Sequence, residues 1–135
     1  MKKLLTVSID AAIKAGREIL EVYKQDFSVE TKSDNSPLTI ADKKAHHIIK
    51  DTLAETGYPL LSEEGKQMGY DERNAWQTFW LVDPLDGTKE FIKKNGEFTV
   101  NIALIYKNTP ILGVVYAPAL GDMYWAKENE GAYKN

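Results

Sequence analysis

Residues 79–88 read FWLVDPLDGT and join an apolar run to a cluster of acidic and turn-forming residues. The apolar run is bounded by polar segments, which is typical of a buried strand. Pro84 fixes its own φ and lacks an N–H, so it predicts that the strand ends and the backbone bends just after Asp83. Such a bend would turn the side chains of Asp83 and Asp86 toward a common point.

Two helices are predicted upstream of this stretch. Over residues 4–23, apolar side chains recur at steps of three and four, as on one face of an amphipathic helix. Residues 27–38 lose this period and collect Ser, Asp and Asn, which predicts a polar loop. Thr39 is the predicted N-cap of the second helix, which would carry Asp42 in its first turn and end before Pro59.

Downstream, the apolar pattern changes to that of strands. Residues 98–106 and 111–116 predict an antiparallel hairpin whose turn covers residues 107–110, and residues 123–126 predict a further strand. Leu60-Leu61 is a short strand-like run, and residues 130–135 have the composition of a turn that enters another strand. Helices followed by strands favour an α+β fold, with two N-terminal helices packed on a mostly antiparallel sheet.

Length and composition exclude several classes of protein. The chain has 135 residues, a formal net charge of −3 and no cysteine. One domain is therefore expected, and the absence of cysteine excludes disulfide scaffolds and thiol catalysis. Without a basic block, nucleic-acid binding is not expected. No apolar run approaches the roughly 18 residues of a membrane span, so we expect a soluble, cytoplasmic protein.

Carboxylates gather where the predicted elements begin or end. Asp42 begins the second helix, Glu63 follows the Leu60-Leu61 run, and Asp83 and Asp86 follow the buried strand. Acids brought together from separate segments need a cation, and magnesium prefers a few carboxylates together with water and phosphate. Taken by itself, however, Asp-Pro-x-Asp-Gly is also good turn chemistry. Spacing alone therefore leaves a plain turn and a metal site open.

Residues that follow the acids suit phosphate. Gly87 permits close approach of the backbone, and a helical turn that begins at Thr88 would present free N–H groups to an anion. The Thr88 hydroxyl could orient a metal-bound water.

His46-His47 has no partner at ligand spacing and is assigned no role. The three tryptophans are interpreted as packing residues.

Three ordered motifs resemble a known family. These are LTIAD at 38–42, LSEE at 61–64 and LVDPLDGTKEF at 81–91, and together they resemble the inositol monophosphatase superfamily of magnesium-dependent, lithium-sensitive phosphatases. The runs 80–104 and 110–118 most resemble its CysQ-type 3'(2'),5'-bisphosphate nucleotidases, and Lys89-Glu90-Phe91 favours that branch over the inositol branch. The resemblance implies the N-terminal half of a layered αβαβα sugar-phosphatase-like fold.

The resemblance also implies a role for individual residues. Glu63, Asp83 and the carbonyl of Leu85 would bind a first Mg²⁺, and Asp83 and Asp86 a second. Asp42 matches an acid that helps to hold a third ion and its waters. Thr88 together with Glu63 matches the pair that orients the attacking water, and Asp86, Gly87 and Thr88 match the substrate-binding segment. Lys32 and Asp34 fall in the family's mobile loop beside the site.

The function implied is hydrolysis of 3'-phosphoadenosine 5'-phosphate to AMP and phosphate, a reaction of sulfur assimilation. The alternatives are an inositol monophosphatase and a non-catalytic metal- or phosphate-binding half-domain. Relatives carry a second half with a Trp-Asp motif that has no counterpart here, so we expect residues 1–135 to be an N-terminal metal-binding domain whose second metal site lacks a ligand. Inhibition by Li⁺, self-association into a homo-oligomer and a peripheral position at an inner membrane are further expectations.

Overall fold

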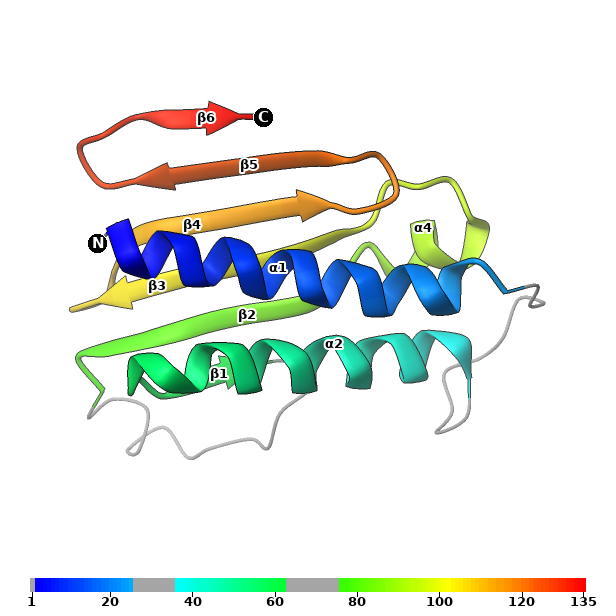
Figure 1. Ribbon diagram of the computed structural model, residues 1–135, viewed down its shortest axis with the longest axis horizontal. Coiled ribbons are helices and arrows are strands. Elements are labelled where there is room, and N and C mark those ends of the chain that lie inside the picture. The colour runs from blue at the N-terminus through cyan, green and yellow to red at the C-terminus, as the bar shows by residue number, and fades with distance from the viewer. Residues whose placement is uncertain (1, 26–35, 63–75) are drawn as a thin grey trace.

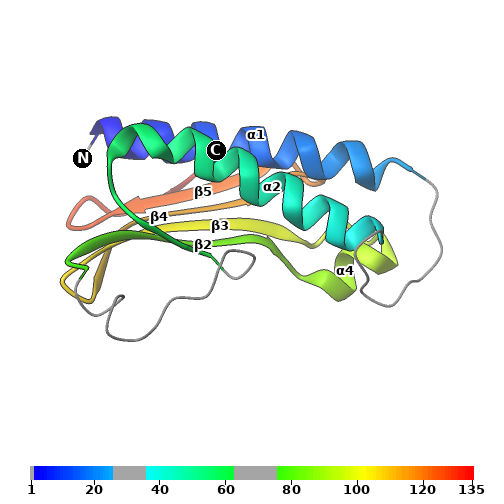
Figure 2. The same ribbon diagram turned by 90° about the horizontal axis from the view of Figure 1, so that it is seen from below.

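Two long helices cover one face of a mixed sheet in the computed structural model, which describes residues 2–25, 36–62 and 76–135 (Figure 1). Viewed from below, both helices lie on the same side of the strands (Figure 2). The elements in chain order are α1 (Lys2–Tyr23), α2 (Pro37–Leu53), η1 (Ala54–Thr56), β1 (Leu60–Ser62), β2 (Thr78–Asp86), α4 (Thr88–Lys93), β3 (Thr99–Tyr106), β4 (Thr109–Ala117), β5 (Asp122–Lys127) and β6 (Ala132–Lys134).

The first helix packs closely on the sheet because the middle of its buried face is made of small residues. Ala11, Ala12 and Ala15 have no exposed surface. At Gly16, an added Cβ would lie 2.6 Å from Cε2 of Tyr116 on β4, so only glycine permits this approach. The helix predicted over residues 4–23 is thereby confirmed, and its apolar stripe is the face that meets the sheet.

The second helix begins earlier than the sequence analysis predicted. Ser36 is the N-cap: its hydroxyl accepts a hydrogen bond from the Thr39 N–H at 3.1 Å, and Pro37 occupies the first turn. The prediction of Thr39 as N-cap was therefore wrong, because proline suits the first helical position and its predecessor takes the cap. The prediction that Asp42 lies in the first turn was also wrong, since the helix starts five residues before it.

The sheet has six strands in the order β1-β2-β3-β4-β5-β6. All neighbouring pairs are antiparallel except β1 and β2, which run parallel and align Leu60 with Trp80. Each strand therefore lies beside the strand that precedes it in the sequence, as is usual for hairpins and meanders. The predicted α+β fold, with two N-terminal helices on a mostly antiparallel sheet, is confirmed.

The hairpin between β3 and β4 closes more tightly than predicted. Lys107 and Asn108 both have positive φ, 47° and 65°, as a two-residue type I′ turn requires. Thr109 and Pro110 already pair with Tyr106 and Ile105. The turn predicted over residues 107–110 therefore ends two residues sooner, because a type I′ turn needs no more chain and its twist matches that of the strands.

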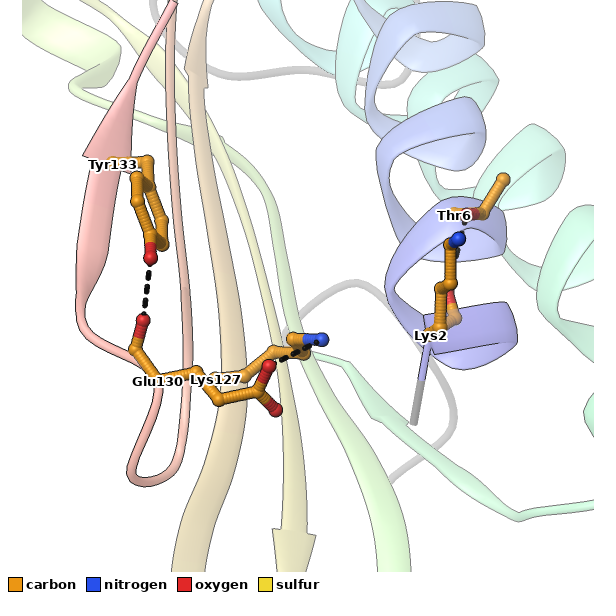
Figure 3. Close-up of polar contacts among 5 residues, drawn as sticks. All are labelled: Lys2, Thr6, Lys127, Glu130 and Tyr133. Carbon is orange, nitrogen blue, oxygen red and sulfur yellow. Dashed lines mark hydrogen bonds and ion pairs between the residues drawn. The ribbon is translucent and has the colours of Figure 1, made fainter.

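A hydrogen bond and an ion pair stabilise the turn that leads into the last strand, β6. Figure 3 shows the Tyr133 hydroxyl donating to the carbonyl of Glu130 at 2.8 Å, while the Glu130 carboxylate pairs with Lys127 Nζ at 3.1 Å. The same view shows Thr6 donating to the Lys2 carbonyl at 3.0 Å in the first turn of α1. The further strand predicted after residue 130 is confirmed as β6.

The core lies between the helices and the sheet. Trp80, Phe91 and Phe98 have no exposed surface, and the alternate residues of β3 are buried. On the opposite face of the sheet, Leu81 and Val115 remain exposed. The buried Trp80 agrees with its interpretation as a packing residue. No helix in the described ranges is both long and apolar enough to cross a membrane.

Candidate metal- and phosphate-binding site

The candidate site is built on an irregularity at the end of β2. Pairing of β2 with β3 aligns Asp83 with Asn101 and Asp86 with Thr99, and the register shifts between these two pairs. Two residues therefore separate the acids on β2, whereas only Val100 lies between their partners on β3. An extra residue on one strand of a pair is a β-bulge, which bends that strand locally.

The bulge places both carboxylates on the same side of the sheet. In a regular strand, residues three apart would point to opposite faces. Thr99 and Asn101 are two apart and share a face, and residues paired across two strands point the same way. Asp83 and Asp86 therefore share the face of Thr99 and Asn101. That face is opposite to the one on which Trp80 and Val82 are buried under the helices.

Proline acts here differently from the sequence-based expectation. The prediction that the strand ends just after Asp83 was wrong, because β2 continues through Pro84 to Asp86. Pro84 and Leu85 are consecutive buried residues, which a regular alternating strand would not produce. A proline within a sheet is tolerated at a bulge, where its missing N–H breaks no ladder bond. The predicted bend exists, and it takes the form of a bulge within the strand.

A short helix follows the second acid directly. Gly87 is the N-cap of α4, with φ 89° and ψ 50°, and its carbonyl accepts the first helical bond from the Phe91 N–H at 3.0 Å. A Cβ at Gly87 would lie 3.2 Å from the Phe98 Cα and 3.3 Å from the Glu97 carbonyl oxygen. The predicted helical turn at Thr88 is confirmed. The N–H groups of its first turn have no acceptor within the helix and are directed away from it.

Asp86 is tied to β3 by a chain of two hydrogen bonds. Asn101 Nδ2 donates to Asp86 Oδ2 at 3.0 Å, and the Thr99 hydroxyl donates to Asn101 Oδ1 at 2.9 Å. Neither Asn101 nor Thr99 was predicted as a site residue from the sequence, because their contact with Asp86 depends on the register between two strands. The only signal in the sequence is two polar residues at alternate positions in an otherwise apolar strand.

The third predicted acid lies on α2. Asp42 is only 2% exposed, and α2 packs against both β2 and α4. Both views show the beginning of α2 on the side of the molecule that carries α4 (Figures 1 and 2). The N-terminal half of α2 therefore lies at the same end of the sheet as the β2 bulge. Burial of a carboxylate is costly unless polar or charged groups surround it. Such groups gather at the end of a sheet where ligands bind.

One turn further along α2, His46 contacts the end of β1. Its Nδ1 lies 3.1 Å from the Ser62 hydroxyl, and Ser62 is itself buried. His46 was assigned no role from the sequence, since it has no partner at ligand spacing, and its contact with Ser62 spans 16 residues and two elements. The contact joins the helix that carries Asp42 to the strand that leads toward Glu63.

Several predicted site residues lie outside the described residues. These are Glu63, Lys32 and Asp34. Within residues 2–25, 36–62 and 76–135, no three His, Asp or Glu side chains are grouped so as to hold a metal ion by themselves. Asp83, Asp86 and the Leu85 carbonyl nevertheless offer oxygen donors only, which is the donor type that magnesium takes. A magnesium ion needs just one or two carboxylates when water and phosphate complete its shell, so this donor set fits it.

Comparison with known proteins gives the same family throughout. Residues 1–135 match the model of the inositol monophosphatase family. The CysQ 3'(2'),5'-bisphosphate nucleotidases of Shigella flexneri and Escherichia coli K12 are each 54% identical over 123 residues, which cover 88% of this chain and 50% of the relative. The chain thus spans about half the length of the curated relatives it matches.

Solved structures show the same fold. The crystal structure of CysQ from Bacteroides thetaiotaomicron superimposes with a TM-score of 0.91 at 56% identity, over 97% of this chain and 48% of that one. The extragenic suppressor protein SuhB from Bartonella henselae gives a TM-score of 0.81 at 32% identity, over 98% and 51% of the two chains. The motifs, the fold and these matches agree: the chain belongs to the inositol monophosphatase family.

Proposed function

We propose that this chain forms the metal-binding half of a magnesium-dependent phosphatase that hydrolyses 3'-phosphoadenosine 5'-phosphate to AMP and phosphate. The observation that carries the proposal is the β2 bulge, which puts Asp83 and Asp86 on one face just before the start of α4. Family membership supports the reaction class, and the identity to CysQ 3'(2'),5'-bisphosphate nucleotidases supports the substrate.

Charge determines the order of binding. A bisphosphorylated nucleotide is strongly anionic, and the acids that we assign to the site would repel it. Divalent cations held by these acids would reverse the local sign of charge, so we expect the substrate to bind tightly only to the metal-loaded site. Asp83, Asp86 and the Leu85 carbonyl would hold these ions together with Glu63, and Asp42 would help to hold the waters of a third.

The residues after the acids would hold the phosphate and the water. The N–H groups of Gly87 and Thr88 would donate hydrogen bonds to a phosphate oxygen, and the Thr88 hydroxyl with Glu63 would aim the attacking water at phosphorus. When bound, Mg²⁺ lowers the pKa of its water and stabilises the leaving oxygen. The water oxygen forms a new bond to phosphorus, the bond from phosphorus to the ribose 3' oxygen breaks, and that oxygen receives a proton. One water is consumed, and AMP and inorganic phosphate are released.

The experiment uses a hybrid chain in which these 135 residues replace the matched half of Escherichia coli CysQ. Phosphate release is measured with 3'-phosphoadenosine 5'-phosphate and with inositol 1-phosphate, at increasing Mg²⁺. We expect Mg²⁺-dependent release from the nucleotide, faster than from the inositol phosphate, and inhibition by Li⁺. The 135-residue chain alone is assayed in parallel.

Each outcome of this experiment supports one of the alternative functions. Faster release from inositol 1-phosphate would replace the nucleotidase assignment with an inositol monophosphatase. Mg²⁺ binding without turnover, in the hybrid as well as in the chain alone, would favour a non-catalytic metal-binding half-domain. A hybrid that releases phosphate equally well in EDTA would contradict the metal-dependent mechanism.

A further inference from the structure

We propose that Asn101 is a positioning residue that orients the Asp86 carboxylate for metal binding, and that Thr99 holds Asn101 in the orientation this requires. The inference rests on the proposed function, since it takes Asp86 as a metal ligand. It adds two residues of β3 to a site that the motifs place on β2 and α4. Neither residue was a candidate in the sequence analysis.

The direction of the hydrogen bonds follows from the chemistry of the three groups. A carboxylate can only accept hydrogen bonds, so the Asn101 atom that faces Asp86 Oδ2 must be the NH₂ group. The amide oxygen then faces Thr99, whose hydroxyl must donate to it. The opposite amide orientation would set oxygen against carboxylate oxygen. The two hydrogen bonds therefore run in one direction only: Thr99 donates to Asn101, and Asn101 donates to Asp86.

The sheet fixes these three side chains in place. Asn101 pairs with Asp83 and Thr99 pairs with Asp86 across the bulge, so both β3 residues lie on the face that carries the two acids. Asn101 and Thr99 are half-buried, whereas Asp86 is exposed. An exposed carboxylate without support would sample several rotamers and would lose that freedom on binding an ion. The bond from Asn101 removes part of that loss in advance.

Only one oxygen of Asp86 takes part in the bond. Asn101 contacts Oδ2, so Oδ1 keeps its lone pairs for a cation, and the amide dipole holds the carboxylate plane. Hydrogen bonds to metal ligands from neighbouring groups orient the ligand in this way, and losing one typically weakens metal binding about tenfold or more. The same arrangement predicts an effect on metal affinity rather than on the chemical step.

The test is a Mg²⁺ titration of the 135-residue chain by calorimetry, on the native sequence and on Asn101→Ala, Thr99→Val and Thr99→Ser. We expect Asn101→Ala to bind Mg²⁺ about tenfold more weakly. Thr99→Val, which keeps the shape but loses the hydroxyl, should be weakened as well. Thr99→Ser restores the donor and should bind like the native chain. In the hybrid enzyme, Asn101→Ala should raise the half-saturating Mg²⁺ concentration while turnover at saturating Mg²⁺ stays within about twofold.

The outcomes separate the inference from the proposed function. Native Mg²⁺ binding together with unchanged affinity in Asn101→Ala would overturn the positioning role and leave the proposed function standing. If the native chain does not bind Mg²⁺ and phosphate release by the hybrid does not depend on Mg²⁺, the proposed function itself is overturned. Circular dichroism of each variant without metal checks folding, and if Asn101→Ala is unfolded, the Thr99→Val and Thr99→Ser pair gives the answer: equal Mg²⁺ affinity in the two would reject the inference.

Discussion

Asp83 and Asp86 are three residues apart on β2, yet both face the same side of the sheet, because β2 holds one more residue than β3 between the two pairs they form. This relationship makes the site possible. Without the extra residue, three-residue spacing would point the two carboxylates to opposite faces. The function that we propose therefore depends on a local defect in the regular strand pattern.

Replacing Gly87 with alanine should destabilise the protein more than the same change at another left-handed glycine. Gly87 has φ 89°, and its added Cβ would lie 3.2 Å from the backbone Cα of Phe98. Left-handed strain costs roughly 1–2 kcal/mol, and a steric conflict with backbone adds about 1–3 kcal/mol. Chemical denaturation of Gly87→Ala measures the loss in the free energy of unfolding.

Gly57 is the matched control for this prediction. It also has positive φ, 78°, but an added Cβ there would meet nothing within 4 Å. Gly57→Ala should therefore show the left-handed strain alone. Equal losses of stability in the two variants would mean that the backbone at Phe98, just before β3, can move away from Gly87, and that this close approach does not require glycine.

Removing the Thr56 hydroxyl should leave a buried donor without its acceptor. Trp80 has no exposed surface, and its indole N–H donates to the Thr56 hydroxyl at 2.9 Å. An unsatisfied buried donor costs about 1–3 kcal/mol, so Thr56→Val should lower the free energy of unfolding by that amount. Thr56→Ser keeps the oxygen and should lose much less. Similar losses in both variants would show that packing, not the hydrogen bond, sets the cost.

The contact between His46 and Ser62 should appear as a coupling energy. Its atoms lie 3.1 Å apart and join α2 to the end of β1. A double-mutant cycle with His46→Ala, Ser62→Ala and the double variant isolates this pair from the other contacts of each residue. We expect a coupling of about 1 kcal/mol in the free energy of unfolding. Single-variant effects that simply add would show that the contact contributes nothing to stability.

The sequence predicted the elements well and their details less well. Helical spacing located α1 and α2, and apolar runs located β1 to β5, because burial imposes a pattern on the sequence. The residues of β6 are all exposed, and this strand was predicted from the composition of the turn before it. The start of α2 was misplaced although Ser36-Pro37 carries the usual signal for a helix start. The path of β2 through Pro84 was missed because a bulge depends on the partner strand, which local sequence does not specify.

Some residues of the candidate site could be predicted from the sequence and others could not. Asp83, Asp86, Gly87 and Thr88 are adjacent in sequence, so one motif revealed them together. Asn101, Thr99 and His46 act through contacts that span 15, 2 and 16 residues. Residues whose partners are set by strand register or by packing of a helix on a strand leave at most a weak local pattern, such as the two polar residues at alternate positions of β3. They become visible only in three dimensions.

In the proposed function, Asp83 holds a divalent cation that makes phosphate release possible. Mg²⁺-dependent phosphate release by the hybrid enzyme carrying Asp83→Asn tests this role. This change keeps the size of the side chain and removes its charge. We expect release from 3'-phosphoadenosine 5'-phosphate to be abolished, while Asp51→Asn, an exposed acid on α2, leaves it unchanged. Near-native Mg²⁺-dependent turnover in Asp83→Asn would show that the Asp83 carboxylate does not hold the cation that phosphate release requires.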